Sequence, residues 1–98
     1  MEIKIKTLKF DADQKLVAYV EKKVSRLEKF FKGAADTAEV TLSLLQEPEN
    51  KQVKIQMHVP GEDLIIERNS STFEQAITDC VDAMKEKLTR TKEKIQEK

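Results

Sequence analysis

Few side chains in this sequence have a type and spacing suited to catalysis. His58 is the only histidine and falls on the polar side of an alternating stretch, with no serine, cysteine or aspartate placed to complete a triad. Cys80, the only cysteine, lies between Ile77 and Met84 on an apolar helical stripe, so we expect a buried, unreactive thiol. One cysteine and one histidine cannot build a structural zinc site. We therefore expect no enzyme, no metal, no cofactor and no small-molecule substrate.

The remaining chemistry lies in the basic side chains, which are distributed unevenly. The zero net charge divides into +4 over residues 1–32, −7 over residues 33–84 and +3 over residues 85–98. Such separation predicts one surface that attracts polyanions and another that repels them. Basic residues recur at helical spacing in both outer segments: Lys15, Lys22, Arg26 and Lys29 in the first, and Lys87, Arg90, Lys94 and Lys98 in the second.

A single row of lysines is commonly no more than a solvated helix face. Two rows on helices that cover the same side of a sheet can instead merge into one positive ridge. Lysine supplies point charges to phosphates, and arginine forks onto phosphate oxygens. The five aromatic residues mostly resemble core residues, so recognition of folded RNA by shape and phosphates fits better than base stacking.

The elements that must position these rows follow from hydrophobic periodicity. Apolar residues alternate with lysines over residues 2–10, which predicts a strand. A helix should follow to about residue 32, with Asp11 as its N-terminal cap and Gly33 as its C-terminal cap. Its apolar side should pack on a sheet and comprises Leu16, Val20, Val24, Leu27 and Phe31.

Three further strands and a long helix are predicted in the rest of the chain. The strands should span residues 38–45, 52–59 and 64–68, with a tight turn at residues 60–63. A capping box over residues 71–74 opens the final helix, whose last turns should extend past the sheet. The apolar stripe of this helix comprises Phe73, Ile77, Cys80, Val81, Met84, Leu88 and Ile95.

The element order predicts an α+β fold of the form βαβββα. One four-stranded sheet should carry two helices packed on the same face, because each helix has one apolar side. We expect residues 1–98 to form a single domain. We see no signal peptide and no apolar run of membrane-spanning length, so the cytoplasm is the expected compartment and no membrane partner is expected.

Two segments together resemble a known family over essentially all 98 residues. The first contains Phe10-Asp11-Ala12 and the helix LVAYVEKKVSRLEKFF at residues 16–31, where the family has an apolar-x-K/R-L-E-K pattern. The second contains TFEQAI at residues 72–77, Val81-Asp82, and LTRTKEKI at residues 88–95. These motifs resemble the ribosome hibernation-promoting factors and ribosome-associated inhibitors, also called the sigma-54 modulation family.

This resemblance implies a hibernation factor that binds the 30S subunit near the decoding site. Such a factor blocks mRNA and tRNA binding and inhibits translation in stationary phase or stress. The implied partners are 16S rRNA and the 30S proteins. Matching the family motif gives the rRNA-binding candidates Lys23, Arg26, Arg90, Lys92 and Lys94, and the helical rows add Lys22, Lys29 and Lys87.

The sequence also departs from the family, and two alternatives stay open. Ala83 and Glu86 stand where the family often has basic residues, which should weaken phosphate binding or move it toward the helix end. The chain stops at Lys98, without the domain that longer relatives use to dimerise ribosomes. The alternatives are a general double-stranded RNA-binding module, and a protein-binding regulator of the sigma-factor type that works through the acidic residues 33–84.

Overall fold

The computed structural model describes residues 2–30, 37–46, 48, 50–59 and 61–96, with side chains as far as Thr91. It has the predicted α+β architecture in the order βαβββα. The elements are β1 (Glu2–Leu8), α1 (Gln14–Ser25), a 3-10 helix η1 (Arg26–Phe30), β2 (Thr37–Leu44), β3 (Lys51–Val59), β4 (Glu62–Ser70) and α2 (Phe73–Gln96).

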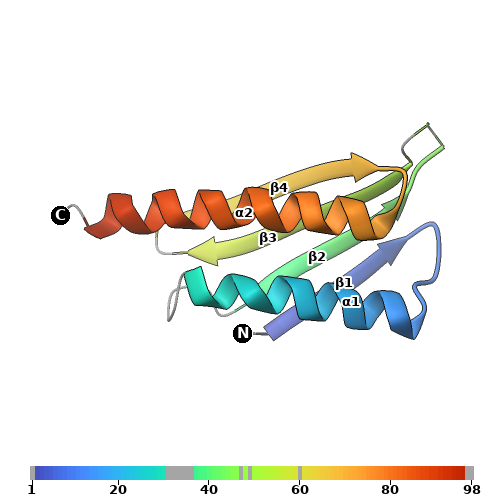
Figure 1. Cartoon of the computed structure of the whole chain (residues 1–98), viewed down its shortest axis with the longest axis horizontal. Helices are drawn as coiled ribbons and strands as arrows, with labels where there is room; N and C mark the ends of the chain where they lie inside the picture. The colour runs from blue at the N-terminus through green and yellow to red at the C-terminus, as the bar shows by residue number, and fades with distance from the viewer. Residues whose placement is uncertain (1, 31–36, 47, 49, 60, 97–98) are drawn as a thin grey trace.

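The four strands form one sheet in sequence order, with both helices against the same face (Figure 1). β1 pairs parallel to β2, and β2, β3 and β4 form an antiparallel meander. The parallel pair requires a crossover connection, which α1 and η1 supply. α1 lies over β1 and β2, whereas α2 lies over β3 and β4, and both helices begin at the same end of the sheet (Figure 1).

The core lies between this sheet face and the two helices. One row of paired residues, Ile5, Val40, Ile55 and Ile66, crosses all four strands and points toward the helices. The predicted apolar sides of the helices are confirmed over the described side chains, whereas Phe31 and Ile95 lie outside them. The buried helix residues are Val20, Val24, Leu27, Phe73, Ala76, Ile77, Cys80, Val81, Met84 and Leu88.

The predicted start and end of the first helix were wrong. β1 ends at Leu8, because Lys9 adopts a left-handed conformation (φ 73°) that turns the chain out of the sheet. Asp13, not Asp11, caps α1 and accepts a 2.8 Å hydrogen bond from the Leu16 N–H. Regular α-helix ends at Ser25 and continues as η1 to residue 30, while Gly33 lies outside the described residues.

The remaining boundaries shift by one or two residues. β2 begins and ends one residue before the prediction, and β3 begins one residue before it. β4 spans nine residues instead of five, because its polar C-terminal half still pairs with β3 as far as Ser70. Thr72, not Ser71, caps α2, and its Oγ1 accepts a 3.1 Å hydrogen bond from the Gln75 N–H.

α2 runs along the strands rather than across them, so it projects past the sheet less than its length suggested. Nine strand residues span about 30 Å and a 24-residue helix spans about 36 Å. Its last turns still extend beyond the strand ends (Figure 1). Thr91 is only 8% exposed, so packing continues three residues past the fully buried Leu88. No helix in the described ranges is long and apolar enough to cross a membrane.

Candidate nucleic-acid interface

Basic side chains from both helical segments line a groove between α1–η1 and α2. Lys23 comes from α1, Arg26 and Lys29 come from η1, and Lys85 comes from α2. The hydrophobic residues Leu27, Phe30 and Val81 also line this hollow, together with Thr78 and one carboxylate, Asp82. Four cations against one anion make this hollow, called here the basic groove, a positive strip on the helical face.

Aromatic rings hold two of the groove lysines in place. Lys23 Nζ lies 5.5 Å from the centroid of the Tyr19 ring, and Lys85 Nζ lies 5.0 Å from that of Phe30. Each contact is within the range of cation–π attraction, at about 0.5–1 kcal/mol for exposed sites. Lys85 therefore reaches from α2 to the η1 side of the groove, and both ammonium groups are positioned before any ligand arrives.

A hydrogen-bonded link fixes the spacing of the two helices. The Thr78 hydroxyl donates to the Glu74 carbonyl (3.0 Å), so its oxygen accepts from the Tyr19 hydroxyl at 3.2 Å. This link joins α1 to α2 at Thr78, which itself lines the basic groove. The groove is therefore a rigid feature of the helix pair rather than a chance approach of long side chains.

The four groove cations form no ion pair within the described part of the chain; they are Lys23, Arg26, Lys29 and Lys85. By contrast, His58 pairs with Asp63, and Arg90 pairs with Glu86. Arg26, Lys29 and Lys85 are exposed, and Lys23 is half-buried. Unpaired, solvent-accessible cations are the groups that replace counterions around a phosphate backbone.

Lys87 lies on the flank of α2 that faces away from the groove. At 100° per residue, Lys87 leaves the helix about 160° from Lys85. It stands seven residues after Cys80, on the side where the Cys80 Sγ donates to the Ile66 carbonyl of β4 (3.3 Å). Lys87 therefore does not join the α1 row in this groove, because α2 turns the flank that carries Lys85 toward α1 and η1.

Arg90 occupies the outer surface of α2, beside Lys85. Its guanidinium donates to the Glu86 carboxylate at 2.5 Å, an i,i+4 ion pair between exposed side chains. The Glu86 carboxylate therefore partly offsets the positive charge of Arg90, although surface ion pairs of this kind are weak and can open. Arg90 borders a second shallow hollow that shares Lys85 and Asp82 with the basic groove.

The other candidates are placed only in part. Lys22 is exposed on the outward face of α1, one turn before Arg26. Lys92 and Lys94 lie on the α2 backbone, but their side chains are outside the described part. A spacing of seven residues puts Lys92 on the flank of Lys85.

Sequence reasoning missed Lys85, although one signal pointed to it. Lys85 follows Val81 by four residues and Thr78 by seven, so these three residues share one flank of α2. The apolar stripe alone does not show which flank faces α1. That choice depends on how the two helices sit on the sheet, which periodicity does not encode.

The two residues with reactive side chains are placed as predicted. Cys80 is fully buried, and loss of hydration raises the pKa of its thiol to about 12. The His58 side chain is 81% exposed at the β3–β4 turn, where its Nδ1 contacts the Asp63 carboxylate. Among the residues with described side chains, no three His, Cys, Asp or Glu groups gather to hold a metal ion.

Comparisons with known proteins agree with this architecture. Residues 3–96 match the family described as Sigma 54 modulation protein / S30EA ribosomal protein. The N-terminal domain of Protein Y from Thermus thermophilus is 27% identical, with a TM-score of 0.80 over 93% of this chain and 99% of that one. A ribosomal subunit interface protein from Coxiella burnetii is 16% identical, with a TM-score of 0.80 over 94% of this chain and 98% of that one, and supports the fold alone.

A comparison with curated protein sequences gives no match. The family match nevertheless covers nearly the whole chain, and the Thermus structure shares its fold from end to end. This chain therefore belongs to the sigma-54 modulation protein and S30EA ribosomal protein family, as the two sequence motifs indicated.

Proposed function

We propose that this chain binds the 30S subunit near the decoding site, blocks mRNA and tRNA, and so inhibits translation in stationary phase or stress. Membership of the S30EA ribosomal protein family supports a ribosomal partner. The observation that carries the proposal is the basic groove, in which two helices present four unpaired cations. The proposed site of action is the cytoplasm, and the direct partners are 16S rRNA and 30S proteins.

The geometry of the groove favours folded RNA over other polyanions. Arg26 can fork onto two phosphate oxygens, whereas Lys23, Lys29 and Lys85 supply point charges around it. The chain as a whole has zero net charge, so long-range attraction to any nucleic acid is small. Binding then depends on an RNA whose phosphates fit the groove, which is a property of a folded particle rather than of an arbitrary strand.

Base stacking contributes little in this proposal. The rings of Tyr19 and Phe30 are only half-exposed, and each already carries a lysine over its face. Unlike single-strand binders, the groove offers no open aromatic platform among its described residues. Phosphate and shape recognition remain as the source of affinity.

The departures from the family pattern affect α2 more than the groove. Glu86 forms its ion pair with Arg90 on the outer surface, and Ala83 is half-buried two residues before Lys85. Neither residue lines the basic groove. The proposal therefore assigns the main phosphate contacts to the groove, with Arg90 as a weaker outer contact.

A binding competition tests the proposal. Purified 30S subunits are incubated with the chain and with labelled tRNA and mRNA, and a simple RNA duplex serves as the competitor. We expect the chain to displace tRNA and to resist the duplex. A chain that binds the duplex as tightly as the subunit is a general double-stranded RNA-binding module, and the proposal then fails.

A matched pair of variants separates groove contacts from general charge. Lys29→Gln with Lys85→Gln removes two groove cations, whereas Lys4→Gln with Lys6→Gln removes two exposed cations from the opposite sheet face. Both variants have the same net charge. The proposal requires that only the groove variant loses its ability to displace tRNA and to inhibit translation.

A further inference from the structure

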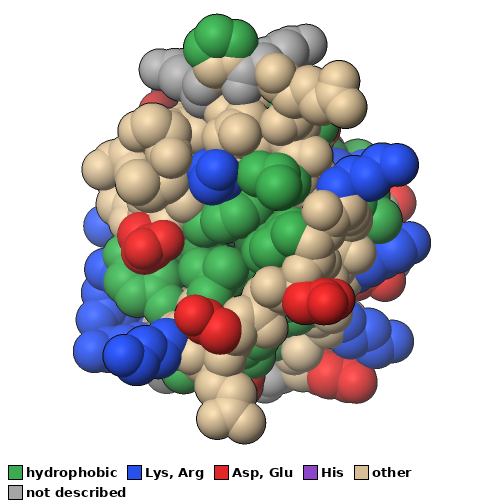
Figure 2. Space-filling view, turned by 90° about the vertical axis from the view of Figure 1, so that its right-hand side faces the viewer, with side chains coloured by type: hydrophobic (Ala, Val, Ile, Leu, Met, Phe, Trp, Pro, Cys, Tyr) green, Lys and Arg blue, Asp and Glu red, His purple; other side chains and the backbone are tan. Residues whose placement is uncertain are grey.

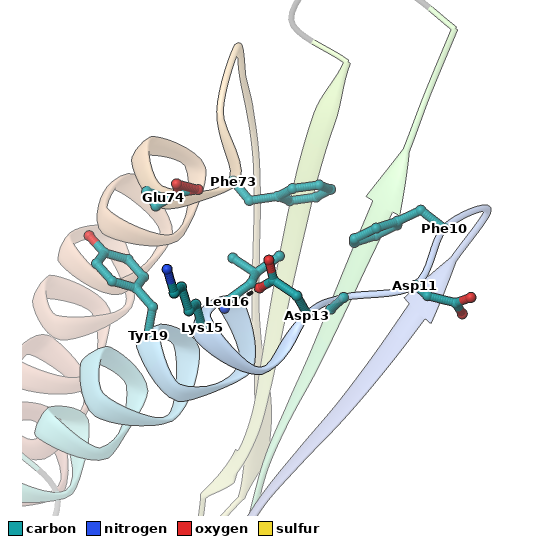
Figure 3. A pocket seen from close by; sticks show the side chains of 9 residues that line it. Phe10, Asp11, Asp13, Lys15, Leu16, Tyr19, Phe73 and Glu74 are labelled. Atoms are coloured by element: carbon teal, nitrogen blue, oxygen red, sulfur yellow. Dashed lines mark hydrogen bonds between the residues drawn. The ribbon is translucent and has the colours of Figure 1, made fainter.

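A second hollow opens where both helices begin (Figure 3), about one helical turn before the basic groove along α2. Residues 10–16 of the β1–α1 connection and the first turn of α2 surround it. Its volume of about 530 Å³ is in the range of pockets that hold small ligands or side chains. This acidic hollow, as it is called below, is not part of the proposed RNA contact.

Aromatic side chains form the wall of the acidic hollow. The rings of Phe10 and Phe73 stack with centroids 4.6 Å apart and planes inclined by 15° (Figure 3). Leu16 and Tyr19 complete the apolar lining. Phe10, Leu16 and Tyr19 are each only half-buried, so part of this apolar surface faces water. Covering an apolar hollow of this kind with another chain lowers the free energy, because apolar surface is removed from water.

The rim of the hollow is acidic. Asp11, Asp13 and Glu74 stand around it with one ammonium group, that of Lys15. Asp13 caps α1, but Asp11 and Glu74 make no hydrogen bond or ion pair with their side chains in the described part of the chain. Figure 2 views the molecule from this end and shows a hydrophobic patch with acidic side chains along its border.

These charges select the class of ligand. Two helix N-termini at one place usually attract a phosphate, but here carboxylates already occupy those positions. A phosphate would meet these carboxylates, whereas a guanidinium can pair with one of them and lie flat against an aromatic ring. The Asp11 carboxylate points outward from the ring pair, and Glu74 lies on the other side of the hollow (Figure 3). Arginine combines both properties in one planar group.

We propose that the acidic hollow docks an arginine-bearing segment of a small-subunit protein while the basic groove holds rRNA. The inference rests on the proposed function, because the 30S particle supplies both partners. Opposite charges at two neighbouring positions along one helix pair admit a single orientation on a surface of mixed RNA and protein. The hollow therefore contributes register and orientation more than bulk affinity.

Photo-crosslinking at two positions tests the assignment. The cross-linking residue p-benzoylphenylalanine replaces Lys15 at the hollow or Lys29 at the groove in the full chain, and each protein is irradiated with purified 30S subunits. We expect position 29 to yield an adduct with 16S rRNA and position 15 to yield an adduct with a small-subunit protein. An rRNA adduct at position 15, or none while position 29 reacts, overturns the inference.

Charge-neutral variants make the test specific. Asp11→Asn with Glu74→Gln should lower the protein adduct at position 15 by about threefold to tenfold, and leave the rRNA adduct at position 29 unchanged. The control, Glu39→Gln with Glu67→Gln on the open sheet face, should change neither adduct. An unchanged protein adduct in the Asp11 and Glu74 variant contradicts the inference. Absence of both adducts in the proteins that keep Asp11 and Glu74, with no chain on the particle, instead shows that the proposed function fails.

Tyrosine fluorescence gives a readout that needs no ribosome. Tyr19 is the only tyrosine, and the chain has no tryptophan, so the emission reports on the hollow that Tyr19 lines. A short Ala-Arg-Leu-Arg-Ala peptide should change this emission saturably, whereas its Ala-Gln-Leu-Gln-Ala counterpart should not. Equal responses to the two peptides overturn the assignment of an arginine site.

Discussion

The basic groove and the acidic hollow are built by the same two helices, yet they carry opposite charge. Four cations and one carboxylate line the groove, whereas three carboxylates and one ammonium group line the hollow. Aromatic rings shape both regions, through Tyr19 and Phe30 in one and through Phe10 and Phe73 in the other. The chain's zero net charge therefore hides two surfaces with different partners.

Helix polarity explains why the charges separate along the helices. α1 and α2 begin at the same end of the sheet, so their positive N-terminal dipole ends lie together (Figure 1). Carboxylates stabilise a helix N-terminus and cations stabilise the C-terminus, by about 0.3–1 kcal/mol each. Asp13 and Glu74 stand at the starts of the helices, and Lys22 and Lys23 in the last turn of α1. One charge pattern thus stabilises the fold and separates the two surfaces.

The largest effect is expected when the charge of the groove is reversed. Lys23→Glu with Arg26→Glu removes two phosphate contacts and adds repulsion, so 30S affinity should fall by about 100-fold or more. Neither side chain is fully buried, so the thermal melting curve should stay close to that of the native chain. Inhibition of in vitro translation at the native level by this variant would reject the groove as the binding site.

A smaller effect should separate the two flanks of α2. Lys85→Gln removes a groove cation, and should weaken 30S binding by about threefold to tenfold and flatten the salt slope by about 0.7–0.9. Lys87→Gln removes the same charge from the other flank, where we expect a change of about twofold at most. A larger loss for Lys87 than for Lys85 would place the RNA over β4 rather than between the helices.

Removing the ring beneath Lys85 should have a smaller effect still. Phe30→Leu keeps an apolar side chain but loses the cation–π contact, which should cost about twofold to fivefold in 30S affinity. The combined Phe30→Leu and Lys85→Gln variant should be no weaker than Lys85→Gln alone, because the ring acts through the lysine. Fully additive losses would show that Phe30 contacts the RNA itself.

Cys80 lines neither the basic groove nor the acidic hollow, so its thiol serves as a probe of folding. Burial raises its pKa from the ordinary value of 9.0 to about 12, so the folded protein keeps its thiol proton where the unfolded chain loses it. This group's contribution to stability is therefore full below pH 9 and is lost as the pH rises from 9 toward 12. Thiol labelling of the native chain should be far slower than in denaturant, and equal rates would contradict the buried placement.

The sequence predicted the helices and the sheet well because their apolar periodicity is strong. Val20, Val24 and Leu27 are fully buried where a 3.6-residue repeat placed them. It predicted β4 too short, because the polar residues 62–63 and 69–70 resemble turn segments and only pairing with β3 keeps them extended. Local signals do not contain this long-range pairing.

The candidate site was only partly predictable for a related reason. The family motif identified Lys23, and helical spacing identified Arg26 and Lys29, because these two side chains recur on the outward side of one helical segment. Lys85 was missed and Lys87 was included, since the facing flanks of two helices depend on their packing. Similarly, Asp11 and Asp13 are equally good caps by residue type, and the left-handed turn at Lys9 decides between them.

The salt dependence of 30S binding tests the central claim most directly. Affinity is measured by co-sedimentation over a range of salt concentrations for the native chain, the Lys29→Gln and Lys85→Gln variant, and the Lys4→Gln and Lys6→Gln control. We expect a slope of log affinity against log salt of about −3 for the native chain, flattened by about 1.5 in the groove variant and unchanged in the control. A chain that stays off the particle at about 50–100 mM salt, or a groove variant with the native slope, would contradict the account.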